Sequence, residues 1–368
     1  MEYLKIDVET TNFLYCPNEV ETLETHIVKV INHHINRLGN KKIDVLVLGL
    51  WCEEYNDNQL QTIQDSINVI KEHFSFEIVL LLGEQYRRVR YDDINKSTRQ
   101  FYNADVYYIW AFPYRFYVKI FEQKLCEPSD TYQQHTINKF LLLVGKPNRI
   151  HRIKLLYKLY KKDLLKYCLW RFKIHNEYIR NECRRLLYDI SDEEFDRFVD
   201  DCEQDLDNVV MNYHPDSSHY PGIPFERWIW DTSAFQVIPE TDFCNNFPSE
   251  KTWLAFMNKT PFIMLAQIHH NEKLRELGFR TFEKYLVHDS YNDVDNDNLE
   301  GRLDEIVENI ECWVHNIDKF YEEIKVDVEH NFQTFIKLVK QEEDIILSII
   351  NKYNLDCKPS DLVVGYYE

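Results

Sequence analysis

A dense group of basic side chains follows an apolar run near the middle of the chain. Arg149 and Arg152 fall where a predicted strand through Val144 turns into a predicted helix that begins near His151. The first backbone N–H groups of a helix and the helix dipole favour anions. Two arginines at this point therefore predict a phosphate site.

More cations continue along the same predicted helix. They are Lys146 before it and then Lys154, Lys158, Lys161, Lys162 and Lys166, against one acid, Asp163. Side chains at these positions project from different faces of a helix, so we expect Lys158, Lys161 and Lys162 to face solvent. There they either touch an anionic acceptor or do nothing. The alternative for the whole row, arginines included, is a basic surface that balances acidic neighbours.

A second polar group lies in ETDFCNNFPSEKTW, residues 240–253. A predicted strand ends at Glu240, and Ser249, Glu250 and Lys251 open a helix. Ligands of open α/β sheets bind beyond the carboxyl ends of the strands, so we expect both polar groups at one site. An acid there accepts hydrogen bonds from ribose hydroxyl groups, and Lys251 neutralises a diphosphate. The alternative is ordinary capping of the helix.

Three carboxylates follow predicted strands in the first part of the chain. Glu53 and Glu54 come shortly after the apolar run 43–50, and Glu84 ends the apolar run in 76–86. A general base that deprotonates an acceptor hydroxyl belongs in such a position. The alternative for each of the three is an ordinary loop acid.

The elements that must position these groups alternate between strands and helices. Short apolar runs rich in branched residues indicate buried strands, and apolar residues at spacings of three and four indicate helices. The pattern runs to about residue 138, restarts at 140, and gives way to long helices after Leu299. We expect an α/β fold with domains at 1–138 and 139–320 and a helical extension at 321–368. Two Rossmann-like domains facing a cleft, a GT-B-like arrangement, fit this pattern, as do other doubly wound pairs.

Composition narrows the class of protein. With 368 residues and 44% hydrophobic residues, the chain has enough apolar material for two packed cores. Its net charge of −19 disfavours nucleic acid as a partner through long-range repulsion. The sequence opens without a basic and apolar leader and has no apolar run of the roughly 20 residues that a bilayer needs, so we expect a cytoplasmic protein with no membrane span.

The sequence gives little indication of a metal site. The nine cysteines are scattered without a CxxC pair, so neither a disulfide framework nor a zinc site is expected. The acidic run from Asp289 to Asp297 lacks the glycine and final glutamate of a calcium loop. His269 and His270 have no third ligand beside them in the sequence. We therefore expect no bound metal and no resident cofactor.

Three stretches resemble one known family in residue identity, in order along the chain and in spacing. They are KPNRIHRIKLLYKLYKKDLLKYCLW, ETDFCNNFPSEKTWLAFMNKTPFIMLAQIHHNEKLRELGFRTF and HDSYNDVDNDNLEGRLDEI. Together they resemble the C-terminal half of the fucosyltransferase-like glycosyltransferases of large viruses, phages and marine bacteria. The resemblance covers about residues 138–320. It departs from the family pattern after SEK-T, where this chain has WLAFMNK, and after the next strand, where AQIHHN replaces a Gly-Pro loop.

The resemblance implies a function and a site. It implies transfer of a sugar, hexose or pentose, from a nucleotide-diphosphate sugar to an acceptor hydroxyl, without a metal ion, and in the host cytoplasm if the protein is viral. It implies a nucleotide-sugar site lined by Arg149, Arg152, Glu240, Glu250 and Lys251, with Lys146 and His151 close by. The acceptor is a glycan, a protein or a small molecule, and the basic row keeps a modified base in DNA open. The rival is a non-catalytic module that binds a nucleotide or glycan on the same fold.

Overall fold

The computed structural model describes two compact units. The described residues are 3–7, 44–50, parts of 61–83 and 113–118, 104–109, 132, 138–144, 147–171, 177–204, 227–240, 248–289 and 298–363. One unit consists of Met1–Val118 with Lys337–Glu368, and the other of Lys119–Ile336. The last residues of the chain, predicted as a separate extension from 321, are thus divided between the two units at 336.

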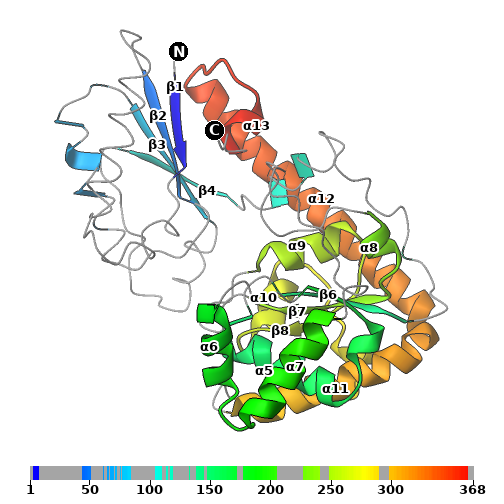
Figure 1. Ribbon diagram of the computed structural model, residues 1–368. Coiled ribbons are helices and arrows are strands. Elements are labelled where there is room, and N and C mark those ends of the chain that lie inside the picture. Colours follow the sequence, from blue (N-terminus) through cyan, green and yellow to red (C-terminus); the bar gives the residue numbers. More distant parts are fainter. Residues whose placement is uncertain are drawn as a thin grey trace. The chain divides into compact units, whose positions relative to one another are not determined.

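The first unit is built on a parallel sheet of four strands (Figure 1). The strands are β1 (Tyr3–Asp7), β2 (Val45–Leu50), β3 (Glu77–Gly83) and β4 (Asp105–Ile109). In the register of β2 and β3, Val47 lies opposite Val79, and both are fully buried. The predicted strands at 43–50 and within 76–86 are therefore confirmed, and β1 had not been predicted.

The strand order of this sheet explains why the C-terminal segment belongs to the unit. Each strand of this parallel sheet lies beside the strand that precedes it in sequence, always on the same side. Because crossovers are right-handed, connections of this kind all pass over one face and leave the other to a different segment. Figure 1 draws the helical pieces of 61–72 and the C-terminal helices on opposite sides of the strands. At the start of β4, Asp105 accepts hydrogen bonds from Lys352 and Tyr353.

The second unit holds a parallel sheet whose strand order reverses. Its strands are β5 (Phe140–Leu143), β6 (Cys168–Arg171), β7 (Phe235–Pro239) and β8 (Phe262–Leu265). The order across the sheet is β6-β5-β7-β8, all parallel. Strand β6 therefore lies on one side of β5, and β7, the next strand in sequence, lies on the other side of β5. The point of reversal, between β5 and β7, is where ligands of doubly wound folds bind.

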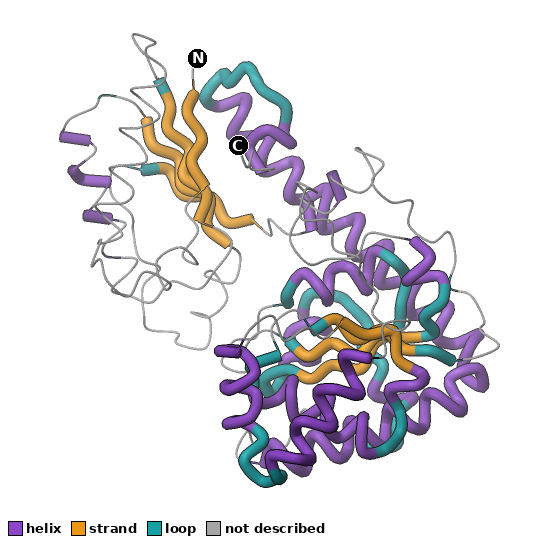
Figure 2. The backbone as a smooth tube through the Cα atoms, viewed as in Figure 1, coloured by secondary structure: helices purple, strands orange, loops and turns teal. Residues whose placement is uncertain are grey.

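Helices lie on both faces of the second sheet (Figures 1 and 2). They are α5 (Ile150–Lys161), α6 (Glu177–Leu186), α7 (Asp192–Gln204), α8 (Arg227–Asp231), α9 (Glu250–Met257), α10 (His270–Glu276), α11 (Leu299–Asn316) and the first half of α12 (Tyr321–Lys352). Short 3-10 turns cover Leu165–Tyr167, Glu283–Tyr285 and Ile317–Phe320, and α13 (Pro359–Val363) follows α12. The helices predicted after His151, Ser249 and Leu299 are confirmed.

Aromatic rings join the second sheet to α11. Phe235 in β7 stacks on Phe140 in β5 with ring centroids 5.5 Å apart, and meets Trp313 edge-on at 5.1 Å. The indole N–H of Trp313 donates to the carbonyl of Tyr285 at 2.9 Å, so this fully buried ring also has its polar atom paired. Edge-to-face pairs of this kind add to the free energy gained by burying the rings.

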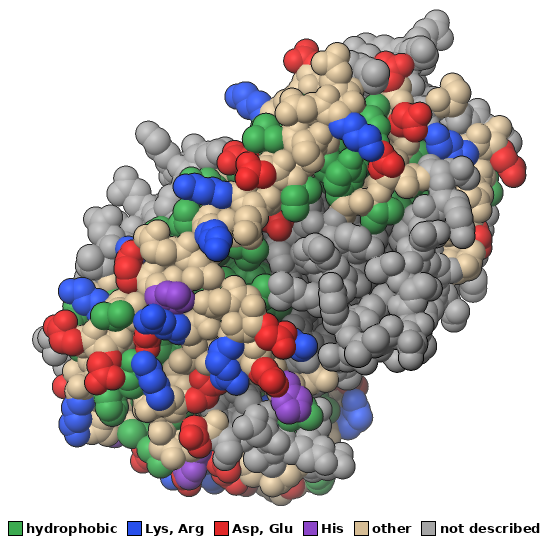
Figure 3. Space-filling model, turned by 180° about the vertical axis from the view of Figure 1, so that it is seen from behind, with side chains coloured by type: hydrophobic (Ala, Val, Ile, Leu, Met, Phe, Trp, Pro, Cys, Tyr) green, Lys and Arg blue, Asp and Glu red, His purple; other side chains and the backbone are tan. Residues whose placement is uncertain are grey.

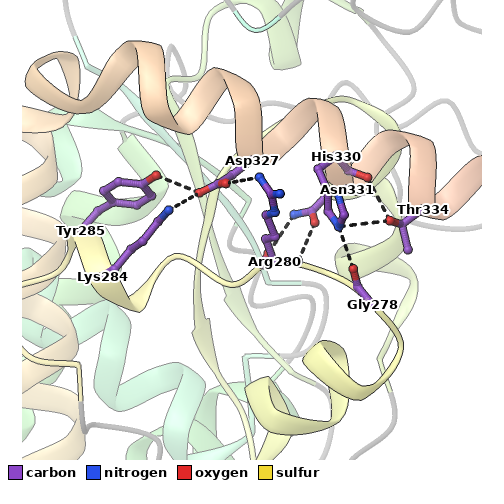
Figure 4. A network of polar contacts seen from close by, with 8 residues as sticks. All are labelled: Gly278, Arg280, Lys284, Tyr285, Asp327, His330, Asn331 and Thr334. Atoms are coloured by element: carbon purple, nitrogen blue, oxygen red, sulfur yellow. Dashed lines mark hydrogen bonds and ion pairs between the residues drawn. The ribbon is translucent and has the colours of Figure 1, made fainter.

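Polar contacts hold α12 against the segment that follows α10 (Figure 4). The buried Asp327 carboxylate accepts hydrogen bonds from Arg280 at 2.8 Å and Tyr285 at 2.7 Å, and forms an ion pair with Lys284 at 2.9 Å. Asn331 brackets the backbone of Arg280, accepting from its N–H at 2.7 Å and donating to its carbonyl at 2.8 Å. This segment is therefore fixed through both its side chains and its backbone.

We expect Asp327→Ala to destabilise the protein by about 2 kcal/mol, because it removes charge-assisted bonds from three donors. Burial opposes ionisation of Asp327, but Lys284, Tyr285 and Arg280 outweigh burial and lower its pKa. The stabilisation is therefore present above the ordinary pKa of 3.8 and is lost as pH falls through the lower pKa of the folded state.

Chemical denaturation measures both the loss of stability in Asp327→Ala and the pH dependence of the wild-type protein. As the control, Glu308→Ala removes an exposed acid paired with His288 and should cost under about 0.5 kcal/mol; equal losses would contradict the assignment.

Candidate functional site

The start of α5 is tied to the end of β7 across the point of strand reversal. His151 bonds through Nε2 to the carbonyl oxygen of Glu240 at 2.8 Å, and Arg152 donates through Nη2 to the carbonyl of Pro239 at 3.1 Å. Because a carbonyl only accepts, the His151 proton lies on Nε2. The polar groups predicted after two different strands thus meet at the carboxyl edge of one sheet.

Glu240 and Ser249 both serve as caps for α9. One oxygen of the buried Glu240 carboxylate accepts from the backbone N–H of Ser249 at 3.0 Å and from the hydroxyl of Thr252 at 2.6 Å. The Ser249 hydroxyl accepts from the backbone N–H of Lys251 at 3.3 Å. These bonds are the capping interactions that the sequence left open as an alternative.

Two cations and one acid form a partly buried cluster beside these caps. Lys251 is ion-paired with Glu250, and Glu250 also lies close to Arg152, which is only 2% exposed. Burial lowers the pKa of Arg152 to about 10, against the opposing effect of Glu250 and Glu240. Burial opposes ionisation of Glu250, but Lys251 and Arg152 outweigh burial and lower its pKa. At neutral pH Arg152 is therefore a cation and Glu250 an anion.

The start of α5 differs from that of α9 in having no side-chain cap. Arg149 is the N-cap residue, its side chain makes no capping hydrogen bond, and the first turn holds no acid. The Arg149 side chain is exposed and lies near enough to Arg152 to lower its pKa further. A helix start with two neighbouring guanidinium groups favours an anion.

The remaining cations of the basic row pair with acids of the second unit. Lys154 and Lys158 meet Glu300, and the ammonium of Lys158 also lies 2.6 Å from Asp304. The other three pairs are Lys161 with Glu194 at 2.8 Å, Lys162 with Glu311 at 3.5 Å, and Lys166 with Asp163 at 2.5 Å. Lys161 and Lys162 are more than half exposed, as expected, whereas Lys158 is only 24% exposed because it lies between Glu300 and Asp304. The described lysines of the row are therefore paired with acids. On the face opposite to that of Figure 1, basic and acidic side chains are likewise intermixed (Figure 3).

Two residues at this edge were not predicted as part of the site. Arg302 in α11 is fully buried and donates to the carbonyl of Ala266, directly after β8, at 2.5 Å. His270 opens α10 and is also fully buried. The sequence indicated the His269-His270 pair only as an incomplete metal site, and Arg302 occupies an ordinary position in a helical pattern.

Several predicted residues lie outside the described residues. These are Lys146 and the three carboxylates Glu53, Glu54 and Glu84. Within the part of the chain that the structure describes, no group of three or more His, Cys, Asp and Glu side chains could hold a metal ion. No described helix combines the length and the apolar character needed to cross a bilayer.

No model of a known protein family matches the chain, and no curated protein matches its sequence. The resemblance to fucosyltransferase-like enzymes therefore rests on the three stretches themselves.

We expect the stability of the protein to fall as pH drops below about 6.5, and His270→Leu to reduce this dependence. Burial lowers the pKa of His270 from its ordinary 6.5, and Glu240 opposes only part of that shift. The unfolded chain then takes up the proton first, which costs stability by up to about 1.4 kcal/mol per pH unit. Denaturation between pH 7.5 and pH 5 measures the slope. The exposed His269→Asn should keep it, and an unchanged slope in His270→Leu would contradict this explanation.

We expect combined replacement of Lys158, Lys161 and Lys162 by alanine to have a small effect on stability. Lys161 and Lys162 each lose an exposed ion pair worth about 0–1 kcal/mol, and Lys158 loses a partly buried one; salt weakens all three. Denaturation at low and high ionic strength measures this effect. Salt-dependent binding of a DNA duplex by the wild-type protein, lost in the triple variant, would show instead that the row is open to a polyanion.

Proposed function

We propose that the protein is a glycosyltransferase that moves a sugar from a nucleotide-diphosphate sugar to an acceptor hydroxyl. The observation that carries the proposal is that Arg149, Arg152 and Glu240 lie together at the reversal point of the second sheet, with Lys251 linked to Arg152 through Glu250. Folds with this strand order bind nucleotides at that point. The three motif stretches that resemble fucosyltransferase-like enzymes supply the same residues independently.

The charges of the site suit a departing diphosphate. Transfer of a sugar breaks the bond between its anomeric carbon and the diphosphate, which leaves with additional negative charge. Arg149 and the uncapped N–H groups of α5 stabilise that charge, and Lys251 does so by exchanging Glu250 for phosphate oxygens. This chemistry requires no metal ion in the proposed mechanism.

The first unit is proposed as the acceptor side of a GT-B-like pair. Strands β2 and β3 are parallel neighbours, so they end at the same edge of their sheet. In sequence, Glu53 and Glu54 follow the end of β2, and Glu84 follows β3 directly. One of these three acids deprotonates the acceptor hydroxyl in an inverting reaction. The acceptor is a glycan, a protein or a small molecule, and the pairing of the basic row makes DNA the least favoured.

The second candidate is a module that binds a nucleotide or glycan without turnover. The observation in its favour is that Glu240 and Ser249 are already engaged as caps of α9. Incubation with nucleotide sugars separates the two functions. An enzyme releases free nucleoside diphosphate slowly even without acceptor, whereas a binding module is stabilised by ligand and releases none.

We expect Arg149→Ala and Lys251→Ala each to weaken nucleoside-diphosphate binding about ten- to a hundredfold, since charge-assisted phosphate contacts contribute roughly 1.5–3 kcal/mol. Arg152→Ala is a poorer probe, because Arg152 is buried and bonded to Pro239. A thermal-shift screen of GDP-, UDP-, ADP- and CDP-linked sugars identifies the donor, and calorimetry then measures affinity.

The matched control is Arg185→Ala, which removes an exposed guanidinium paired with Glu182 on α6. Its affinity for the same nucleotide should equal that of the wild-type protein. Unchanged affinity in both Arg149→Ala and Lys251→Ala would refute the phosphate site.

A further inference from the structure

The segment after β8 carries a group of buried polar atoms without partners. Neither ring nitrogen of His270 has a hydrogen-bond partner among the described residues, and the same holds for the side-chain oxygens of Gln267 and Asn271. His270 is 0% exposed and Asn271 4%. Buried polar atoms in folded proteins are nearly always paired, because an unpaired one keeps the full cost of leaving water. Three such side chains within five residues indicate a binding partner that the described residues do not supply.

This segment lies beside the candidate phosphate site. Strands β7 and β8 are paired neighbours, with Pro239 opposite Leu265, and Glu240 donates its backbone N–H to the carbonyl of Leu265 at 2.9 Å. The carboxylate of Glu240 is close enough to raise the pKa of His270 against the larger effect of burial. The unpartnered imidazole therefore belongs to the same sheet edge as the starts of α5 and α9.

The unpaired atoms differ in chemistry from the cations at the start of α5. A buried neutral imidazole offers one donor and one acceptor, and the two amide oxygens offer acceptors only. Phosphate oxygens also only accept, so a phosphate here would leave the amide oxygens unpaired. Hydroxyl groups both donate and accept, and they satisfy the whole set.

We propose that His270, Gln267 and Asn271 bind the ribose hydroxyl groups of the donor nucleotide, while Arg149 and Lys251 hold the diphosphate. The inference rests on the proposed function and adds the direction in which the donor lies along the sheet edge. Local opening of the segment admits the ligand, because the ring is closed off in the free protein.

The test compares GDP, UDP, ADP and CDP with inorganic pyrophosphate, which has no hydroxyl-bearing sugar. Calorimetry on the wild-type protein and His270→Leu should show a roughly tenfold loss of affinity for the bound nucleotide and none for pyrophosphate. Removing the 2′- or 3′-hydroxyl from that nucleotide should weaken binding to the wild-type protein and have less effect on the variant. Asn271→Ala provides a second variant, and His269→Asn the control.

Ligand-free stability gives a second readout. Leucine in place of an unpartnered buried imidazole should leave the melting temperature unchanged or raise it, whereas loss of a residue that supports the fold would lower it. Equal losses for nucleotide and pyrophosphate, or nucleotide affinity unchanged in both His270→Leu and Asn271→Ala, would overturn this inference alone. Failure of the wild-type protein to bind any nucleoside diphosphate or nucleotide sugar would overturn the proposed function and this inference with it.

Discussion

The second unit depends on Glu240, through which three elements are held at one edge of the sheet. Its backbone carbonyl accepts from His151 in α5, its N–H donates to Leu265 at the end of β8, and its carboxylate caps α9. A carboxylate this deeply buried is tolerated only when its oxygens are hydrogen-bonded. The same bonds that satisfy Glu240 therefore fix where the starts of α5 and α9 lie, and with them Arg149, Arg152 and Lys251.

Charge is distributed unevenly between this edge and the rest of α5. Further along the helix each cation meets an acid of the same unit, so a row that reads as strongly basic in sequence has little unpaired charge. At the start of the helix, Arg149 and Arg152 lie close together. In a chain with a net charge of −19, an anionic ligand is drawn by such a local arrangement and not by the global field.

The sequence predicted individual strands and helices better than it predicted the contacts between them. Buried parallel strands leave continuous apolar runs, which is why β2, β3, β5 and β7 were recognised. Strand β6 was missed because CLWR is short and follows a basic stretch, and β1 because YLKID alternates polar and apolar residues. Strand order, the bonds of Glu240 and the burial of His270 depend on contacts between distant segments, which no local pattern encodes.

The order of the units along the chain has a consequence for synthesis on the ribosome. Residues 119–336 are contiguous, so the second unit can fold as soon as they emerge. The first unit combines 1–118 with 337–368, and Asp105 must wait for Lys352 and Tyr353. At about 5–20 residues per second, the N-terminal strands spend many seconds without their last partners. The unit whose synthesis begins first is therefore completed last, and its apolar strands are the ones most exposed to misassociation in the interval.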